Sequence, residues 1–301
     1  MGFTLHYKYW SNWLVLGQLI DKPRMPTAIV TGASSGIGKA LVRVLVSRGY
    51  LVFAGARRVD SMQDLKLLGA HVHSLDVTDQ DSIDAFKEYV EKHLEGGKLD
   101  YLFNNAGVPC KIPGAELEIE DAIYCYNVNV FGVMRMVGTF TPLLIAAKGK
   151  IVNTGSVAGE VPMPFSSVYA SSKAALHSYA DTLRLELAPF GVKVITTKTA
   201  TVRTGITDNR GIKDDSMYKI VEDGLQSLKE NTENSNPQDP DEYAKDVVNI
   251  VTRNPKPFFY VGGGLWKVYV VGLLPRSMVD SFVMKISKLD QIPKRLAELK
   301  T

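Results

Sequence analysis

The chain has 301 residues, of which 45% are hydrophobic and 22% charged, and this balance is typical of a globular protein with one large core. The formal net charge of +3 is small and evenly spread, which argues against a nucleic-acid-binding protein. Cys110 and Cys125 are too few for a disulfide framework, and neither stands at metal-ligand spacing from a histidine. We therefore expect an intracellular protein without a metal site.

Residues 1–24 form an N-terminal extension that differs from the rest of the chain. It contains Trp10, Trp13 and the run WLVLGQLI, which is too short to span a bilayer and is not followed by a signal-peptide cleavage site. Two interpretations stay open: an interfacial membrane anchor, or a tail packed on the body of the protein.

A regular alternation of strand-like and helix-like segments begins at Thr27. The apolar runs TAIVT, LVFAG, HVHSL, YLFN, KIVNT and VKVITT are separated by stretches with helical periodicity. Strands that are apolar throughout are typical of a parallel sheet covered on both faces, and right-handed crossovers make such a sheet doubly wound. We expect an α/β fold with one domain over residues 25–263, followed by an apolar C-terminal extension over residues 264–301.

The first strand ends in the glycine-rich sequence TGASSGIG, with a helix starting near Ile37. Backbone N–H groups and the helix dipole at this point favour a bound anion, and the glycines let a pyrophosphate approach closely. The segment predicts a dinucleotide site, with a simple strand-helix turn as the alternative. Its candidate cofactor-binding residues are Gly32, Ser34, Ser35, Gly36, Ile37 and Gly38.

The end of the second strand indicates which dinucleotide binds. NAD-binding sheets carry an acidic residue there for the ribose 2′-hydroxyl, whereas this chain has Ala56 followed by Arg57 and Arg58. A guanidinium pairs well with a 2′-phosphate, so we expect NADP(H); two solvated arginines are the alternative. Asp76, which closes the third strand, is a candidate for the adenine amino group, with a helix N-cap as the alternative.

A second set of polar residues follows in the middle of the chain. Tyr169 and Lys173 are four residues apart in a predicted helix over Ser167–Leu187, so a lysine ammonium lies one turn from a phenol on the same face. Such a pair is suited to proton transfer. Ser156 precedes it, and Asn129 lies upstream in NVNVFG.

TGASSGIG, the NNAG of Asn104–Gly107, NVNVFG, Ser156 and YASSK together resemble the short-chain dehydrogenase/reductase family, over roughly Thr27–Thr207. The resemblance implies a Rossmann fold and an NADP(H)-dependent oxidoreductase. It also implies that Tyr169 protonates a carbonyl oxygen with a pKa lowered by Lys173, and that Ser156 donates a hydrogen bond to the same oxygen. Each side chain taken alone has a structural alternative, such as a buried tyrosine, a surface lysine or a turn serine.

The resemblance assigns further roles around this set. Lys173 and Tyr169 border the nicotinamide ribose, Asn129 holds a water that connects the lysine to solvent, and Thr204 bonds the nicotinamide carboxamide. The adenosine side is lined by Asn105, Ala106 and Gly107. The chain departs from the family at Thr199–Ala200, where most members have Pro-Gly. This departure leaves open a cofactor-binding protein with altered or lost hydride-transfer chemistry.

The segment after the sixth strand predicts a lid over about residues 206–240. Met217, Tyr218, Ile220 and Leu225 are candidate wall residues for a lipophilic ketone or alcohol, and a lid packed on its own core is the alternative. The polar, proline-punctuated stretch 231–240 is expected to be a loop.

The C-terminal run Phe258–Pro275 is nearly long enough to span a membrane, but Lys267 lies at its centre. A central lysine costs about 2.5–3.5 kcal/mol, so a surface contact is more favourable than a span. FFYVG within this run is expected to be the last strand. The remainder is either a peripheral membrane contact or an apolar cap on the protein's own core.

Three segments, GKLDYLFNNAG, KGKIVNTGSVAG and DEYAKDVV, together with the apolar tail, are most similar to the fungal NADPH-dependent 1-acyl-dihydroxyacetone-phosphate reductase group. This similarity implies reduction of a lipid ketone at the endoplasmic reticulum or lipid droplets, with the cytoplasm as the alternative location. Ketoreductases or dehydrogenases of fungal secondary metabolism share these features. Arg203 and Arg210 are candidates for a substrate phosphate, and family helices near Phe131–Ala147 and Ser167–Leu187 favour a homodimer or homotetramer.

Overall fold

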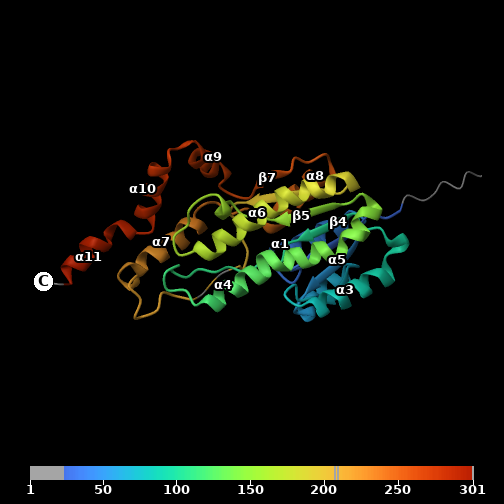
Figure 1. Ribbon diagram of the computed structural model, residues 1–301, viewed down its shortest axis with the longest axis horizontal. Coiled ribbons are helices and arrows are strands. Elements are labelled where there is room, and N and C mark those ends of the chain that lie inside the picture. The colour runs from blue at the N-terminus through green and yellow to red at the C-terminus, as the bar shows by residue number, and fades with distance from the viewer. Residues whose placement is uncertain (1–23, 207, 209, 300–301) are drawn as a thin grey trace, which may run out of the picture.

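The computed structural model describes residues 24–206, 208 and 210–299, so all of the predicted N-terminal extension except Arg24 lies outside the described residues. Seven parallel strands form one sheet in the order β3-β2-β1-β4-β5-β6-β7 (Figure 1). The strand order reverses between β1 and β4, which is the arrangement of a doubly wound sheet. The strands are β1 (Thr27–Thr31), β2 (Leu51–Ala56), β3 (His71–Ser74), β4 (Tyr101–Asn104), β5 (Lys150–Thr154), β6 (Lys193–Thr199) and β7 (Phe258–Val261).

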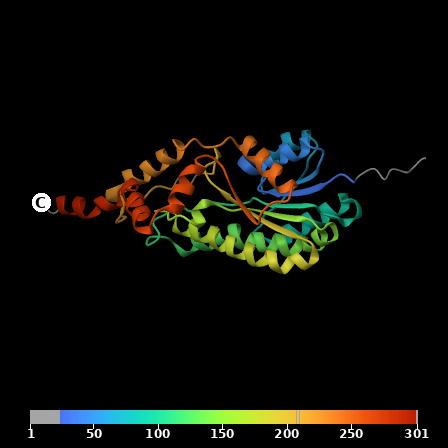
Figure 2. The same cartoon turned by 90° about the horizontal axis from the view of Figure 1, so that it is seen from above.

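Helices cover both faces of this sheet, and Figure 2 shows the two layers from above. One face is covered by α1 (Gly36–Ser47), α2 (Gln63–Leu67) and α8 (Pro240–Thr252). The other is covered by α3 (Gln80–His93), α5 (Gly132–Ala147) and α6 (Ser167–Leu187). The predicted α/β fold and the predicted bounds of the helix carrying Tyr169 and Lys173 are both confirmed.

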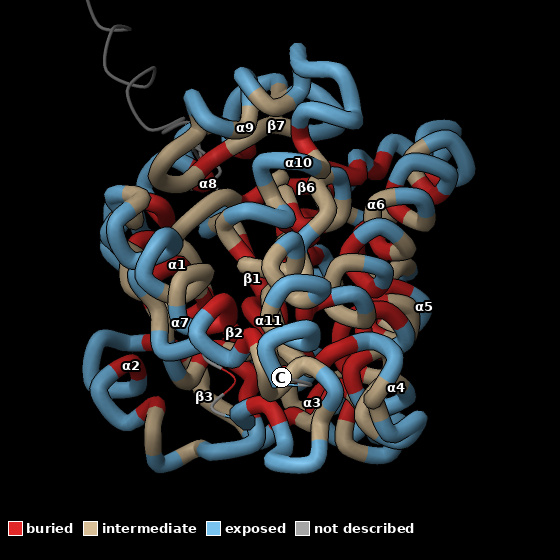
Figure 3. Tube along the Cα trace, turned by 90° about the vertical axis from the view of Figure 1, so that its left-hand side faces the viewer, coloured by how far each residue is buried: buried red, intermediate tan, exposed pale blue. Residues whose placement is uncertain are grey.

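Strand β1 shows why these strands are apolar throughout. Ala28 and Val30 pack in the core beneath α1 and α8, whereas Ile29 between them packs in the core on the α5 and α6 side. Successive side chains of a strand point to opposite faces, so a sheet buried on both sides needs an apolar residue at every position. Figure 3 shows the buried segments gathered along the strands.

A continuous helical run leads from α4 (Ile119–Tyr126) through the π-helical turn η3 (Asn127–Phe131) into α5. By length and composition the run over Ile119–Ala147 is long and apolar enough to cross a membrane. Met136, Phe140 and Leu144 are nevertheless fully buried against the sheet, so α5 is a core helix.

Short single-turn helices connect the main elements. They are η1 (Val59–Met62), η2 (Glu95–Gly97), η4 (Val157–Gly159), η5 (Ala188–Phe190), η6 (Lys219–Val221) and η7 (Leu289–Gln291). The predicted lid segment contains α7 (Glu222–Glu233), so the first three residues of the predicted loop 231–240 are helical instead, and its last residue, Pro240, begins α8. Residues 231–233 extend α7, and the side chains of Asn231 and Thr232 donate to backbone carbonyls one turn back, at Ser227 and Leu228.

The C-terminal extension forms α9 (Leu265–Leu273), α10 (Arg276–Ile286) and α11 (Ile292–Glu298). Asp223 of α7 pairs with Lys288 and Arg295, each at 2.8 Å. Gly224 allows close approach, because a Cβ at this position would lie 1.9 Å from the Ser287 carbonyl oxygen. The last two helices are therefore attached to α7 and project with it from one end of the molecule (Figure 1).

Candidate active site

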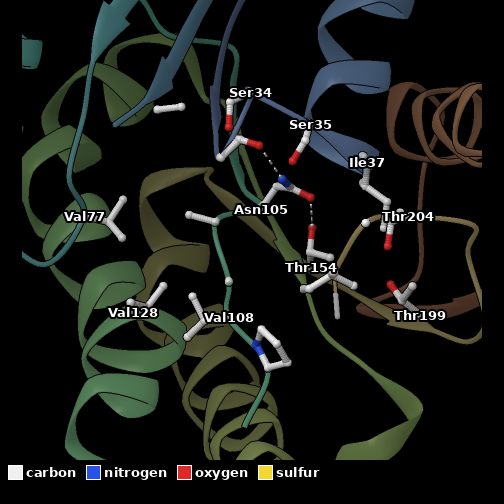
Figure 4. A pocket seen from close by; sticks show the side chains of 18 of the residues that line it. Ser34, Ser35, Ile37, Val77, Asn105, Val108, Val128, Thr154, Thr199 and Thr204 are labelled. Carbon is white, nitrogen blue, oxygen red and sulfur yellow. Dashed lines mark hydrogen bonds between the residues drawn. The ribbon is translucent and has the colours of Figure 1, made fainter. Parts of the chain in front are cut away.

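A cavity of about 390 Å³ lies at the carboxyl ends of the strands, beside the point where the strand order reverses. Figure 4 shows side chains from several elements facing it, among them Ser34, Asn105, Thr154 and Thr204. Most of the predicted site residues line this cavity. They are Gly32, Ser34, Ser35, Gly36, Ile37, Arg57, Arg58, Asp76, Asn105, Ala106, Gly107, Ser156, Tyr169, Lys173 and Thr204.

The glycine-rich turn fits a pyrophosphate. Gly32 and Gly36 have φ of +67° and +52°, and a Cβ at Gly32 would lie 2.8 Å from the Cα of Ala106. Helix α1 begins at Gly36 with no acidic residue in its first turn, so its N-terminal N–H groups favour an anion. Gly38 lies outside the cavity lining; a Cβ there would be 2.3 Å from the Gly32 oxygen, so its role is close packing of helix on turn.

Two arginines line the cavity on the β2 side of the point where the strand order reverses, whereas Ser156 lines it on the β5 side. Arg57 and Arg58 follow β2 directly, are exposed, and line the cavity. The Arg57 guanidinium donates to the Tyr124 hydroxyl of α4 at 3.0 Å. The arrangement offers positive charge without a competing carboxylate at the end of β2, as a 2′-phosphate requires.

Asp76 lines the same end of the cavity but does not cap a helix. Its Oδ1 accepts hydrogen bonds from the backbone N–H and the hydroxyl of Thr78, at 2.9 and 2.7 Å. Asp79 is the N-cap of α3 and accepts from Asp81 N–H. The helix-cap alternative for Asp76 is therefore wrong, because the chain makes one further turn before α3 begins.

The NNAG turn is held by bonds to the neighbouring strands. The Thr31 hydroxyl accepts from the backbone N–H groups of Asn105 and Ala106, both at 3.0 Å. The Asn105 amide donates to the Thr31 carbonyl at 3.1 Å and accepts from the Thr154 hydroxyl at 3.4 Å (Figure 4). These bonds fix the part of the turn that lines the cavity.

Lys173 is only 4% exposed, and its Nζ donates to the Thr154 carbonyl at 2.8 Å. Nζ also lies 5.8 Å from the centre of the Tyr169 ring, which confirms the predicted proximity of ammonium and phenol. Burial lowers the pKa of Lys173 to about 8. The amine is therefore mostly charged at neutral pH, but its pKa lies only slightly above neutral.

The pKa of Tyr169 is raised by burial, opposed by a hydrogen bond with the Ser156 side chain. The predicted lowering of this pKa by Lys173 is therefore wrong for this structure. The physical reason is that desolvation of the phenolate dominates, while the ammonium is directed to the Thr154 carbonyl. A raised pKa keeps the phenol protonated at neutral pH.

Ser156 stands at the start of the single turn η4, where its hydroxyl accepts from the Ala158 N–H at 3.1 Å. The backbone N–H of Ser156 donates to Nε2 of His177 at 3.3 Å. Sequence reasoning missed this histidine. The available signal was its spacing, because His177 is four residues after Lys173 and eight after Tyr169, on the same face of α6.

Asn129 is fully buried in the π-helical turn and lies behind the cavity lining. Its side-chain oxygen accepts from Val108 N–H at 2.9 Å, and its amide donates to the Val108 carbonyl and the Ser172 hydroxyl, both at 3.0 Å. A Cβ at Gly107 would lie 3.3 Å from this oxygen and 3.7 Å from Lys173 Nζ. The Asn129 oxygen and the Lys173 ammonium therefore lie near the same position, beside Gly107. That Asn129 holds a water connecting Lys173 to solvent stays a prediction.

The Thr199–Ala200 turn, which replaces the Pro-Gly of most family members, is fixed by hydrogen bonds to α8, β6 and β7. The Thr199 hydroxyl bonds the Tyr243 hydroxyl of α8 at 2.7 Å and the Thr197 hydroxyl at 3.0 Å. Ala200 N–H donates to the Val261 carbonyl of β7 at 2.8 Å. Thr199 and Ala200 both line the cavity, so the replacement of Pro-Gly keeps a fixed wall there.

The candidate lid residues do not line the cavity. Leu225 is buried in a cluster with Phe165 and Val221, against which Tyr218 and Ile220 pack. Met217 is 65% exposed. The alternative of a lid packed on its own core therefore describes Tyr218, Ile220 and Leu225, whereas Met217 faces solvent.

Neither of the two candidate phosphate-binding arginines lines the cavity. Arg210 pairs with Asp208 at 2.8 Å and with Asp121 of α4 at 2.6 Å, so its charge is already neutralised. Arg203 lines a separate surface pocket together with Asp239 and Glu242.

Comparison with known proteins gives a consistent result. The profile of the short chain dehydrogenase family matches residues 26–215. The chain is 36% identical over 285 residues to the NADPH-dependent 1-acyldihydroxyacetone phosphate reductase of Saccharomyces cerevisiae, covering 92% of this chain and 96% of the relative. It is 40% identical to a short-chain dehydrogenase of Penicillium crustosum, covering 83% and 93%. A short-chain dehydrogenase structure from Streptomyces avermitilis superposes with a TM-score of 0.72 at 26% identity, covering 91% and 98%.

Proposed function

The chain belongs to the short-chain dehydrogenase/reductase family, and on that premise we propose that it is an NADPH-dependent reductase of a lipophilic ketone, 1-acyldihydroxyacetone phosphate. The observation that carries the proposal is a cavity lined both by Ser156, Tyr169 and Lys173 and by Arg57 and Arg58, which follow strands on opposite sides of the point where the strand order reverses. A bound NADPH would place its 2′-phosphate at the two arginines and its nicotinamide beside Ser156, Tyr169 and Lys173.

We assign the cofactor contacts from this geometry. The turn at Gly32 and Gly36, with the N-terminus of α1, receives the pyrophosphate. Arg57 and Arg58 receive the 2′-phosphate. Thr204 lines the cavity, and we assign its hydroxyl to the nicotinamide carboxamide.

The reaction adds a hydride to the carbonyl carbon and a proton to the carbonyl oxygen, which gives a secondary alcohol and NADP⁺. Bound NADPH supplies the hydride. Tyr169 supplies the proton, and its raised pKa keeps the phenol in the protonated form that this step needs. Ser156 donates a hydrogen bond to the same oxygen, and the buried Lys173 ammonium lies one helical turn from Tyr169, 5.8 Å from the centre of its ring.

The alternative function is that of a ketoreductase or dehydrogenase of fungal secondary metabolism. Relatives of 36–40% identity from Penicillium and Pyricularia carry only the general name short-chain dehydrogenase, which supports this alternative. A protein that binds NADP(H) without hydride transfer is the third reading. The intact set of Ser156, Tyr169 and Lys173 argues against it.

The test uses a panel of three carbonyl compounds: 1-palmitoyl-dihydroxyacetone phosphate, dihydroxyacetone phosphate, and a long-chain ketone without phosphate. We expect NADPH oxidation to be fastest with the first. Tyr169→Phe is expected to abolish turnover and to leave the NADPH Kd, measured by fluorescence titration, nearly unchanged. Tight NADPH binding without oxidation by any carbonyl would refute the enzymatic proposal.

We also propose peripheral attachment to the endoplasmic reticulum or a lipid-droplet surface through α9 and α10, with the cytoplasm as the alternative location. Trp266 is 66% exposed and Leu273 is 85% exposed, and Lys267 beside them is suited to anionic headgroups. The double variant Trp266→Ser/Leu273→Ser should lose flotation with anionic vesicles. The matched control Leu67→Ser, at an 89% exposed leucine that ends α2, should retain it.

Self-association is the remaining partner proposal. Phe131, the last residue of η3 directly before α5, and Leu185 near the end of α6 are exposed, next to or on the two helices that pair between subunits in the family. We expect a homodimer or homotetramer. Light scattering of the full chain tests this expectation, and a monomer at micromolar concentration contradicts it.

A further inference from the structure

His177 packs directly against the turn that carries Ser156. Its Nε2 accepts the Ser156 backbone N–H at 3.3 Å. A Cβ at Gly155 would lie 2.5 Å from Nε2, and a Cβ at Gly159 would lie 2.9 Å from the ring carbon Cε1. Glycines on both sides of Ser156 thus leave the space that the imidazole fills.

The imidazole is held in one chemical state. Because Nε2 accepts a hydrogen bond, the ring proton is on Nδ1. Burial, reinforced by the positive charge of Lys198, lowers the pKa of His177 to about 4. Glu160 and Asp181 act in the opposite direction, and Lys173 adds to the lowering. The acceptor is therefore present throughout the neutral pH range.

The far end of the same turn is fixed by a second set of bonds. The Glu160 carboxylate pairs with Lys198 of β6 and accepts from the Tyr260 hydroxyl of β7 at 2.9 Å. The segment 155–160 is consequently held at its start by α6 and at its end by the sheet. The turn positions the Ser156 hydroxyl, which hydrogen-bonds with Tyr169.

We propose that His177 is a positioning residue for catalysis: its Nε2 fixes the backbone at Ser156, so that the serine hydroxyl is aimed at the carbonyl oxygen that Tyr169 protonates. His177 is outside the cavity lining and does not act on substrate directly. The inference rests on the proposed function in one respect, the role of Ser156 toward the carbonyl.

The first test is a double-mutant cycle on the full-length enzyme with 1-palmitoyl-dihydroxyacetone phosphate. His177→Leu should lower kcat by about tenfold to a hundredfold, the scale of a misplaced catalytic group, with the NADPH Kd unchanged. His177→Gln, whose side-chain oxygen can accept the same N–H, should restore most of the loss. In a Ser156→Ala background, His177→Leu should cause no further loss.

An equal loss in both backgrounds would overturn the proposal, because it would mean that His177 does not act through Ser156. Thermal unfolding of each variant identifies any that does not fold, and His177→Ala, which also removes the acceptor, then replaces His177→Leu in the cycle. Loss of NADPH affinity in parallel with kcat would likewise overturn it, since a positioning role for Ser156 leaves nucleotide binding intact.

The second test does not depend on turnover. Nitrogen-15 NMR of wild-type enzyme should show His177 as the neutral Nδ1–H tautomer at pH 7. Amide hydrogen exchange over residues 155–160 should be faster in His177→Leu, with no change over 71–76. A wild-type enzyme that reduces no ketone would overturn the proposed function alone; unchanged exchange at 155–160 would overturn the role of His177.

Discussion

The buried lysine yields a prediction in which loss of function accompanies a gain in stability. Lys173→Met keeps the length of the side chain and removes its charge. At pH 7 the wild-type protein holds an ammonium in a site that is only 4% exposed, with the Thr154 carbonyl as its hydrogen-bond acceptor at 2.8 Å. We expect Lys173→Met to be inactive and more stable than wild type at this pH.

The magnitude follows from the pKa. Burial lowers the pKa of Lys173 from 10.5 to about 8. At about 1.4 kcal/mol per pH unit, keeping this group charged in the folded state costs about 3 kcal/mol. Methionine removes that cost but leaves the Thr154 carbonyl without its donor, which costs about 1–3 kcal/mol. The net expectation is a gain of about 1 kcal/mol in the free energy of unfolding.

The pH dependence provides the sharper assay. Between pH 8 and 10.5 the unfolded chain binds more protons at Lys173 than the folded protein does, so the free energy of unfolding of wild type should rise with pH across that window. Urea unfolding of the nucleotide-free protein measures this rise. Lys173→Met should lack this part of the rise, and the exposed control Lys66→Met should retain it. A Lys173→Met protein with the wild-type slope, or one destabilised by more than about 2 kcal/mol at pH 7, would refute the reasoning.

Three further predictions concern other parts of the site. Gly38→Ala places a Cβ 2.3 Å from the Gly32 oxygen, so we expect at least about a tenfold loss of NADPH affinity in fluorescence titration; a wild-type Kd contradicts the close-packing role. Arg57→Ala should weaken NADPH about tenfold and spare NADH, whereas equal losses would contradict the 2′-phosphate contact. The free energy of unfolding should fall as the pH drops from 6.5 to 4, because unfolded His177 takes up a proton before the folded residue does. His177→Leu should flatten that part of the acid-unfolding curve, and an unchanged curve would contradict the buried neutral imidazole.

Local patterns were sufficient to predict the sheet and the proton-transfer pair. The apolar strand runs have a direct cause in burial on both faces, as the two-sided packing of Ala28 and Ile29 illustrates. Tyr169 and Lys173 are neighbours because of helical geometry alone, so their spacing was enough to place them together. The glycine-rich turn was recognisable for a similar reason, because Gly32 and Gly36 need positive φ.

Features that depend on distant contacts were beyond the reach of sequence patterns. The spacing of His177 from Lys173 places it on the same face of α6, but it does not reveal the contact that His177 makes with Ser156 in the turn η4. The direction of the Tyr169 pKa shift depends on burial, which spacing does not reveal. The lid side chains near Leu225 were apolar enough for a substrate wall, yet they pack against Phe165 and Val221 instead.

The most direct test of the account is isotope transfer from NADPH deuterated at both C4 positions of the nicotinamide to 1-palmitoyl-dihydroxyacetone phosphate. We predict that mass spectrometry will find one deuterium on the carbon of the former ketone with the wild-type enzyme, and none with Tyr169→Phe. Stoichiometric NADPH binding without deuterium transfer to this compound or to any ketone of the panel would contradict the assignment of Ser156, Tyr169 and Lys173 as a reductase site.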